Sequence, residues 1–184
     1  MERRQESFST SSSGRIVRCG VPMDEDTAGP APVLRRAALQ DIPEIMTMMA
    51  NFHADDRIAW DAEEAQRAIR DLLEHQTYGI FWLVELDNRP LGFLVLTFGF
   101  SLEFHGRDAF VDEFYIRPEF RCRGIGTKAL EYAADYCAAN GIRTMHLEVE
   151  DSNPRVHRLY GRKGFADRGY YLLSKRIPAG GSEA

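Results

Sequence analysis

Residues 117–126, "RPEFRCRGIG", combine residue types that could bind an anion. They bring Arg121 and Arg123 next to Gly124 and Gly126, directly after the mostly apolar run "AFVDEFYI". A glycine-rich turn between a strand and a helix presents backbone N–H groups at the positive end of the helix dipole, which suits phosphate oxygens. Arginine side chains add charge-assisted hydrogen bonds. The stretch therefore predicts a phosphate-binding turn, although an ordinary turn with solvated arginines gives the same pattern.

Three kinds of phosphate site could explain this turn. A Walker loop requires GxxxxGK[ST], which "GIGTKAL" does not supply. The dinucleotide fingerprint is matched by Gly124, Gly126 and Ala129, with Glu148 at the distance of a ribose-binding acid. That fingerprint needs a tight turn directly off the first strand, whereas here seven residues separate Ile116 from Gly124 and a hairpin comes first. An acyl-CoA pyrophosphate loop is the third kind.

The elements that must position these residues follow from hydrophobic periodicity and from turn and capping signals. Asp41 and Pro43 open one helix, and Asp61 with Glu64 is a capping pattern for a second. The runs "IFWLVEL" and "LGFLVLTFGF", separated by "DNRP", predict an antiparallel hairpin. The expected order is βααβββαβαβ, an α/β (α+β) fold with a mixed sheet of 6–7 strands and four helices. Its elements are strands at 33–38, 80–86, 91–100, 108–116, 144–149 and 170–177, a helix that begins at 42 and ends before His53, and helices at 61–76, 124–140 and 153–163.

The length and composition of the chain limit the classes of protein to which it can belong. At 184 residues and 44% apolar residues the chain suits one domain, which we expect at 33–178 between a disordered leader (1–32) and a flexible tail (179–184). A formal net charge of −5 argues against nucleic acid as a partner. No apolar run is long enough to cross a membrane. The three cysteines show neither a disulfide framework nor zinc-ligand spacing, so a reducing cytoplasm and no metal are expected.

Two ordered motifs resemble those of the GCN5-related N-acetyltransferase (GNAT) family. Arg121-x-x-Gly124-x-Gly126 after "VDEFYI" resembles the family's pyrophosphate loop, [RQ]xxGx[GA]. Downstream, "NPRVHRLYGRKGF" resembles its second signature, an Asn followed seven residues later by a Tyr and then by "KGF". The resemblance covers residues 33–177 and implies the GNAT fold, acetyl-CoA as co-substrate and N-acetyltransferase activity.

The resemblance implies roles for particular residues. Asn153 would hydrogen bond the pantetheine arm, and Tyr160, on the same helix face, would protonate the departing thiolate. The structural alternatives are a helix cap for Asn153 and a core aromatic for Tyr160. Glu113, or alternatively its neighbour Asp112, would be the general base, unless Glu113 is the partner of a buried arginine. Pantetheine would pair with free backbone on a strand that parts from its parallel neighbour. The residues expected to bind the cofactor are Phe114, Tyr115, Ile116, Arg121, Cys122, Arg123, Gly124, Ile125, Gly126, Thr127, Asn153 and Tyr160.

The acceptor is predicted from charge. Acidic residues near the central strand, with the negative net charge, favour a cationic small-molecule amine, although a solvated acidic face gives the same pattern. The candidate acceptor residues are Asp112, Glu113, Glu103 and His53, with Asp55, Trp82 and Phe100 as further lining. The alternatives are an enzyme acting on protein lysines or N-termini and a non-catalytic acyl-CoA sensor. A homodimer is possible because edge strands are exposed.

Overall fold

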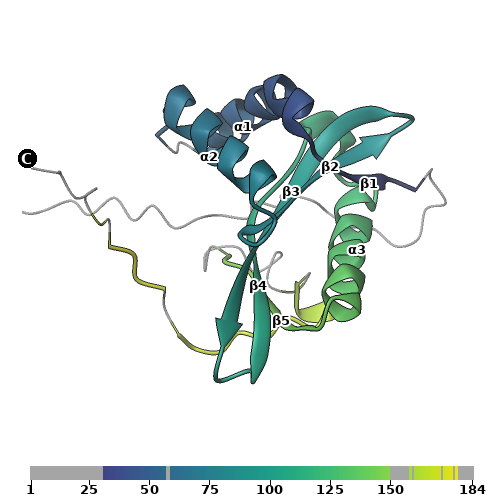
Figure 1. The fold of residues 1–184 in the computed structure, drawn as a ribbon. Helices are drawn as coiled ribbons and strands as arrows, with labels where there is room; N and C mark the ends of the chain where they lie inside the picture. The colour runs from purple at the N-terminus through teal and green to yellow at the C-terminus, as the bar shows by residue number, and fades with distance from the viewer. Residues whose placement is uncertain are drawn as a thin grey trace, which may run out of the picture.

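The computed structural model describes residues 31–56, 59–149, 158, 160–170, 172–175 and 177. The predicted leader, apart from its last two residues, and the predicted tail lie outside these ranges. The elements follow the expected order up to the fifth strand (Figure 1). They are β1 (Val33–Arg36), the 3-10 turn η1 (Leu39–Asp41), α1 (Ile42–Asp56), α2 (Ala62–Glu74), β2 (Gly79–Leu86), β3 (Arg89–Ser101), β4 (Gly106–Ile116), η2 (Pro118–Phe120), α3 (Ile125–Ala139) and β5 (Ile142–His146).

The sheet is mixed and has the strand order β1-β2-β3-β4-β5. Neighbouring strands are antiparallel from β1 to β4, and β5 pairs parallel to β4 after the crossover through α3. Asp87 and Asn88 form the two-residue turn of the predicted β2–β3 hairpin, both with positive φ, of 51° and 60°. Positive φ at both central positions is what a type I′ turn requires, and Asp and Asn adopt it more readily than most residues.

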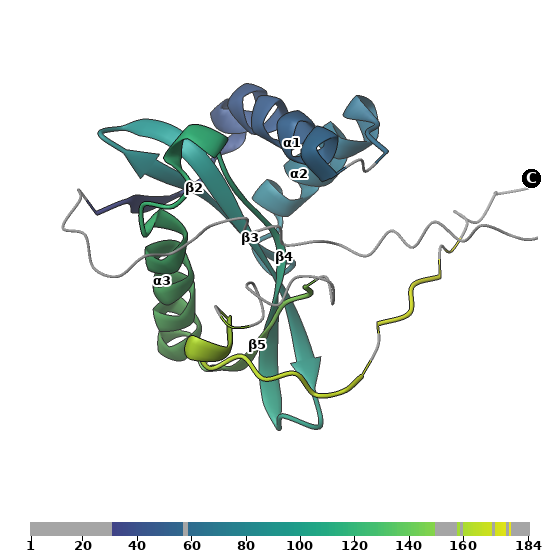
Figure 2. The same ribbon diagram turned by 180° about the vertical axis from the view of Figure 1, so that it is seen from behind.

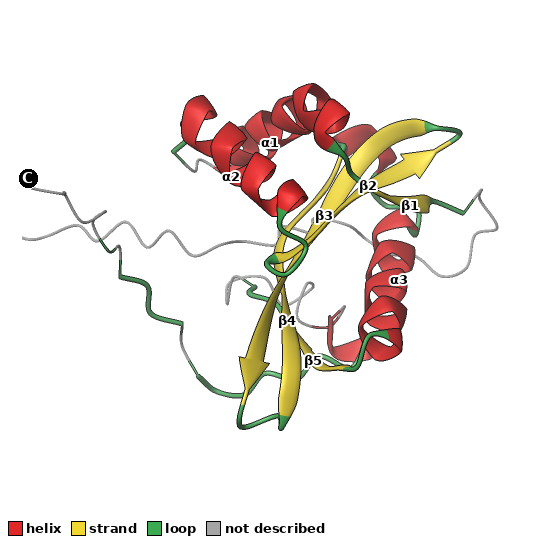
Figure 3. Ribbon diagram, in the orientation of Figure 1, coloured by secondary structure: helices red, strands yellow, loops and turns green. Residues whose placement is uncertain are grey.

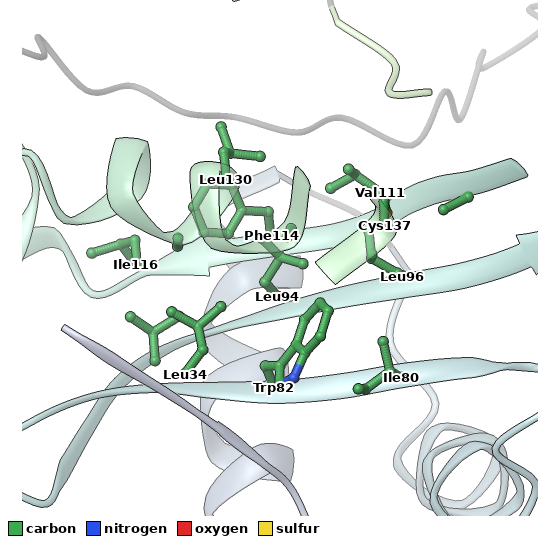
Figure 4. Packing of buried hydrophobic residues seen from close by; sticks show 14 of the residues in the cluster. Leu34, Ile80, Trp82, Leu94, Leu96, Val111, Phe114, Ile116, Leu130 and Cys137 are labelled. Carbon is green, nitrogen blue, oxygen red and sulfur yellow. The ribbon is translucent and has the colours of Figure 1, made fainter. Parts of the chain in front are cut away.

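Helices cover both faces of this sheet, as the two opposite views show (Figures 1 and 2). α1 and α2 pack on one face through Ile45, Met48, Phe52 and Ile69, against Phe93 and its neighbours. α3 packs on the other face, where Trp82 lies among the residues drawn in Figure 4. Each large apolar side chain that is fully buried contributes roughly 1.5–3 kcal/mol to folding. The two apolar cores therefore hold the sheet rigid between its helix layers.

The helix boundaries have local causes. The Asp61 carboxylate accepts hydrogen bonds from the backbone N–H groups of Glu63 and Glu64 at 3.0 Å, which caps α2 at the predicted residue. α3 ends at Ala139 with Asn140 as its C-cap, and Gly141 follows with a φ of 68°. A left-handed residue just past the last turn is the common way to end a helix, and glycine adopts it without steric cost.

Two expectations about the sheet need correction. The described part of the chain contains five strands rather than 6–7 (Figure 3). β5 ends at His146 rather than at residue 149, because β4 no longer runs alongside it there. Within the predicted last strand, 170–177, the described residues form no ladder, and Leu173 is 92% exposed. Apolar and β-branched residues alone predicted that strand, but a strand needs a neighbour with which to pair.

Candidate active site

The glycine-rich turn leads into α3 as predicted. Cys122 and Gly124 both have left-handed backbones, with φ of 64° and 73°, and α3 begins at Ile125. Gly124 occupies the N-cap position, where it has no side chain to cap the helix. The first turn of a helix carries backbone N–H groups without intrahelical partners. The start of α3, including Gly126 and Thr127, thus has the backbone geometry of an anion site.

The two arginines of the turn make contacts that the sequence did not reveal. The Nε of Arg121 donates to the carbonyl of Ile116 at 2.7 Å, and its guanidinium lies 3.2 Å from Oδ2 of Asp55 and over the ring of Tyr115. Arg123 lies over the ring of Phe120. Arg121 therefore fixes the end of β4 against the end of α1, and its contact with a cofactor stays a prediction.

β4 and β5 part next to this turn. Their parallel pairing ends at Phe110 with His146, whereas β4 continues to Ile116. Beyond Phe110 the described part of β5 offers β4 no partner, so one edge of Phe114, Tyr115 and Ile116 faces away from the ladder. Such an edge can pair with the amides of an extended ligand, as an added strand would.

A β-bulge decides which way Glu113 points. Val95 pairs with Glu113 and Leu96 with Val111, so Asp112 is an extra residue in β4. The bulge reverses the alternation of side chains along the strand. Val111 and Phe114 consequently both lie in the core under α3, and Glu113 lies on the α1 face together with Tyr115.

On that face Glu113 meets His53 from the last turn of α1. The two atoms in contact, His53 Nε2 and Glu113 Oε1, are 3.2 Å apart, and the side chains are only 14% and 19% exposed. The His53 ring packs edge-on against Trp60 and Phe52. The described partner of Glu113 is thus a histidine and not the buried arginine that was its structural alternative.

Tyr160 lies on the opposite face of the sheet. Its side chain is 2% exposed and belongs to the core under α3, with its ring against Phe165. Residues 160–162 are helical, and the backbone carbonyl of Tyr160 accepts from Lys163 and Phe165 at the end of this helix. Asn153 lies outside the described residues, so its expected role is not tested by the fold.

The candidate acceptor residues do not all come together. His53, Asp55 and Glu113 gather where α1 meets β4. Glu103 instead lies in the β3–β4 turn, paired with Arg168, and from Gly106 to Glu113 the strand alone spans roughly 23 Å. Of the further lining, Trp82 is buried under α3 against Tyr132 and Tyr136, and Phe100 is exposed near the β3–β4 turn.

Trp60 is the lining residue that the sequence analysis missed. It directly precedes the Asp61 cap and is partly buried against the core under α1 and α2. The sequence signal for Trp60 is an aromatic residue directly before a helix N-cap. A side chain at that position often packs against the first turns of the helix that follows. Burial raises the pKa of the Tyr115 hydroxyl above its usual value of 10.0, so it is a neutral phenol at physiological pH.

The described residues contain no group of three or more His, Cys, Asp or Glu side chains arranged to hold a metal ion. None of the described helices has the length and apolar character needed to cross a membrane.

Comparison with known proteins agrees with the geometry. The sequence pattern of the acetyltransferase (GNAT) family matches residues 46–165. The chain is 25% identical over 147 residues to the uncharacterized N-acetyltransferase YhfO of Bacillus subtilis, an alignment that covers 79% of this chain and 98% of that one. It is 25% identical to the thialysine N-epsilon-acetyltransferase of Mus musculus, over 73% of this chain and 84% of the mouse protein.

Among solved structures, it is similar to the integron cassette protein HFX_CASS3 from the mobile metagenome of Cole Harbour Salt Marsh. That similarity has a TM-score of 0.70 and 32% sequence identity and covers 79% of this chain and 91% of the cassette protein.

Proposed function

Because the chain belongs to the GNAT family and is an N-acetyltransferase, we propose that it transfers the acetyl group of acetyl-CoA to a primary amine of a small molecule. The amine attacks directly in a ternary complex, with Glu113 as the general base and Tyr160 as the general acid. The free thiols of Cys122 and Cys137 agree with the cytoplasm as the proposed location.

One observation carries this proposal: β4 and β5 part beside the glycine-rich turn, and the two candidate catalytic groups lie on opposite faces of the sheet. Glu113 lies on the α1 face of the sheet and Tyr160 on the α3 face. A thioester held in the gap, with its pyrophosphate at the start of α3, is the arrangement in which both groups could reach the reacting atoms. The glycine-rich turn, the gap between β4 and β5, and the candidate acid and base Tyr160 and Glu113 together favour acetyl transfer over simple binding of acetyl-CoA.

The proposed chemistry balances without a covalent enzyme intermediate. An amine with a lysine-like pKa near ~10 is mostly protonated at pH 7, so Glu113 first takes a proton from the ammonium group. The neutral nitrogen attacks the thioester carbon and the new C–N bond forms. As the tetrahedral intermediate collapses, the nitrogen loses its second proton to solvent and the C–S bond breaks. Tyr160 gives its hydroxyl proton to the departing sulfur and regains one through solvent, and one proton is released overall. A backbone N–H of β4 near the gap would stabilise the oxyanion.

The acceptor class follows from the charge of the site. Glu113 brings negative charge to the α1 face, since Arg121 pairs with Asp55 and not with Glu113, and this charge favours a cationic amine. The similarity to thialysine N-epsilon-acetyltransferase points the same way, since that name describes a small amino acid with a side-chain amine. Acetylation of protein lysines or N-termini, and acyl-CoA sensing without catalysis, are the alternatives.

The proposal is tested by calorimetry with acetyl-CoA, followed in the same preparation by free-thiol release with a panel of amines. The panel contains thialysine, lysine, spermidine, and peptides with a free lysine or a free N-terminus. We expect binding and thiol release with at least one small amine. Release with peptides alone would establish a protein acceptor, binding without any release would establish a sensor, and no binding would refute the cofactor assignment.

A further inference from the structure

The contact between His53 and Glu113 joins two elements that are 60 residues apart in the sequence. His53 lies in the last turn of α1, and Glu113 lies in β4 just after the bulge at Asp112. An ionised carboxylate only accepts hydrogen bonds, so the Nε2 that faces Oε1 carries the hydrogen and donates it. The orientation of the carboxylate is thereby fixed through one of its two oxygens.

The imidazole ring itself is held in place by aromatic packing. Its centroid is 4.8 Å from that of Trp60 and 5.5 Å from that of Phe52, both in edge-on arrangements. Phe52 in turn packs against Phe93 and Tyr115 in the core. A donor fixed on a packed ring loses little further freedom when it holds a carboxylate.

The nearby cations are committed to other carboxylates. Arg121 pairs with Asp55, and Arg117 pairs with Glu44 at the start of α1. Glu113 is therefore not neutralised by either arginine, and His53 is its partner in the described part of the chain. An imidazole N–H donor orients a carboxylate through a single hydrogen bond to one of its oxygens.

The second oxygen of the carboxylate remains unused. Glu113 Oε2 is buried and makes no hydrogen bond to any described residue. A buried polar atom without a partner costs about 1–3 kcal/mol, so a folded protein that keeps one calls for an explanation. Proton transfer from an acceptor, directly or through a water, supplies that explanation.

We propose that His53 is a positioning residue for the general base, holding Oε1 of Glu113 so that Oε2 takes the proton of the acceptor amine. This inference rests on the proposed function and changes the role expected of His53, which was contact with the acceptor itself. The N–H bond of the ammonium breaks, its electron pair stays on nitrogen, and the proton binds to Oε2 until product release returns it to solvent. His53 gains and loses no proton in this step.

The test is a double-mutant cycle of His53→Phe and Glu113→Gln, measured as kcat and KM for the best amine of the panel. His53→Phe keeps an aromatic ring against Trp60 and removes the donor. We expect kcat to fall about 100-fold or more in Glu113→Gln and about 10-fold in His53→Phe, with acetyl-CoA affinity unchanged. The double variant should be no slower than Glu113→Gln alone, because the donor acts only through the carboxylate. His53→Gln, whose amide N–H can replace the donor, should recover activity to within about threefold of wild type.

Glu44→Gln is the matched control, since the Glu44–Arg117 pair also ties α1 to the end of β4 but does not touch the base. It should lower thermal stability and leave kcat unchanged. A wild-type kcat in His53→Phe, losses that multiply in the double variant, or an equal loss of kcat in Glu44→Gln would each overturn the positioning role. Failure of the wild-type protein to acetylate any amine would instead overturn the proposed function, and the inference with it.

Discussion

Tyr160 is packed in the core under α3, and its proposed role as the general acid depends on its hydroxyl group. The ring is buried against Phe165 and the core under α3. Tyr160→Phe keeps that packing and removes the transferable proton. We expect kcat to fall by about 100-fold or more, acetyl-CoA affinity to be kept, and the free energy of unfolding to change by about 1 kcal/mol or less.

Tyr136→Phe is the control for this prediction, because Tyr136 also packs under α3, against Trp82 and Phe98. Its hydroxyl has no proposed role, so thiol release should stay at the wild-type rate. Equal turnover by Tyr160→Phe and wild type would show that another group protonates the thiolate.

Asp41 makes a residue-scale contribution to stability that should depend on pH. The Arg35 guanidinium, with which it forms two hydrogen bonds, holds the pKa of this carboxyl below its usual value of 3.8. A carboxyl whose pKa is lower when folded stabilises the protein fully above its unfolded pKa and loses this effect as pH falls through the folded one. Because Arg35 is 40% exposed, Asp41→Asn should cost only about 1 kcal/mol. Urea unfolding should show this difference at pH 7 and a smaller one at pH 3. An equal difference at both values would contradict the prediction.

At the scale of elements, two glycines with a similar positive φ flank α3, one at each end. Gly124 precedes the helix with a φ of 73° and Gly141 follows it with a φ of 68°, and a Cβ added at either would meet no atom within 4 Å. Alanine at either position is therefore strained by its backbone and not by contacts, at a cost of roughly 1–2 kcal/mol. Calorimetry should show weaker acetyl-CoA binding for Gly124→Ala and unchanged binding for Gly141→Ala. Equal affinities in the two variants would argue against the turn as the pyrophosphate site.

The elements that the sequence predicted well are those with local causes. Asp61 caps α2, Asp87 and Asn88 form a tight turn, and Gly141 ends α3, and each depends on residues within four positions in the chain. The prediction of a strand at 170–177 was wrong because a strand has no local cause of this kind. Its formation depends on whether a neighbouring strand lies alongside it. β5 was predicted but ends early, at the point where β4 diverges from it.

The candidate site was partly predictable. The motif identified the turn at Gly124 and the tyrosine at 160, but not the His53–Glu113 contact, because a contact across 60 residues leaves no local pattern. A signal for the bulge was present: the adjacent acids Asp112 and Glu113 interrupt the apolar alternation of β4. Arg121 shows the limit of a motif, since it fixes a residue type but not the atoms that the side chain contacts.

At the scale of the whole molecule, the sheet divides the proposed reaction between its two faces. The α1 face of the sheet carries His53 and Glu113, and the α3 face carries Tyr160, next to the glycine-rich turn that begins α3. Figure 2 shows the two helix layers on opposite sides of the sheet. The gap where β4 and β5 separate connects the two faces of the sheet. This arrangement predicts that cofactor and acceptor protect different parts of the chain when they bind.

Hydrogen exchange measured by mass spectrometry can check this division. Acetyl-CoA at 100 times its Kd should slow exchange in segments 114–116 and 121–127 by up to about 100-fold, because exchange there requires opening of the bound state. The turn at 102–105 serves as the internal control and should exchange at the same rate with and without ligand. An amine added with the non-reactive product CoA should then protect 52–55, at the end of α1. Protection by acetyl-CoA at α1 and α2 alone would reverse the assignment of the faces, since the cofactor would then bind where His53 and Glu113 are proposed to meet the acceptor.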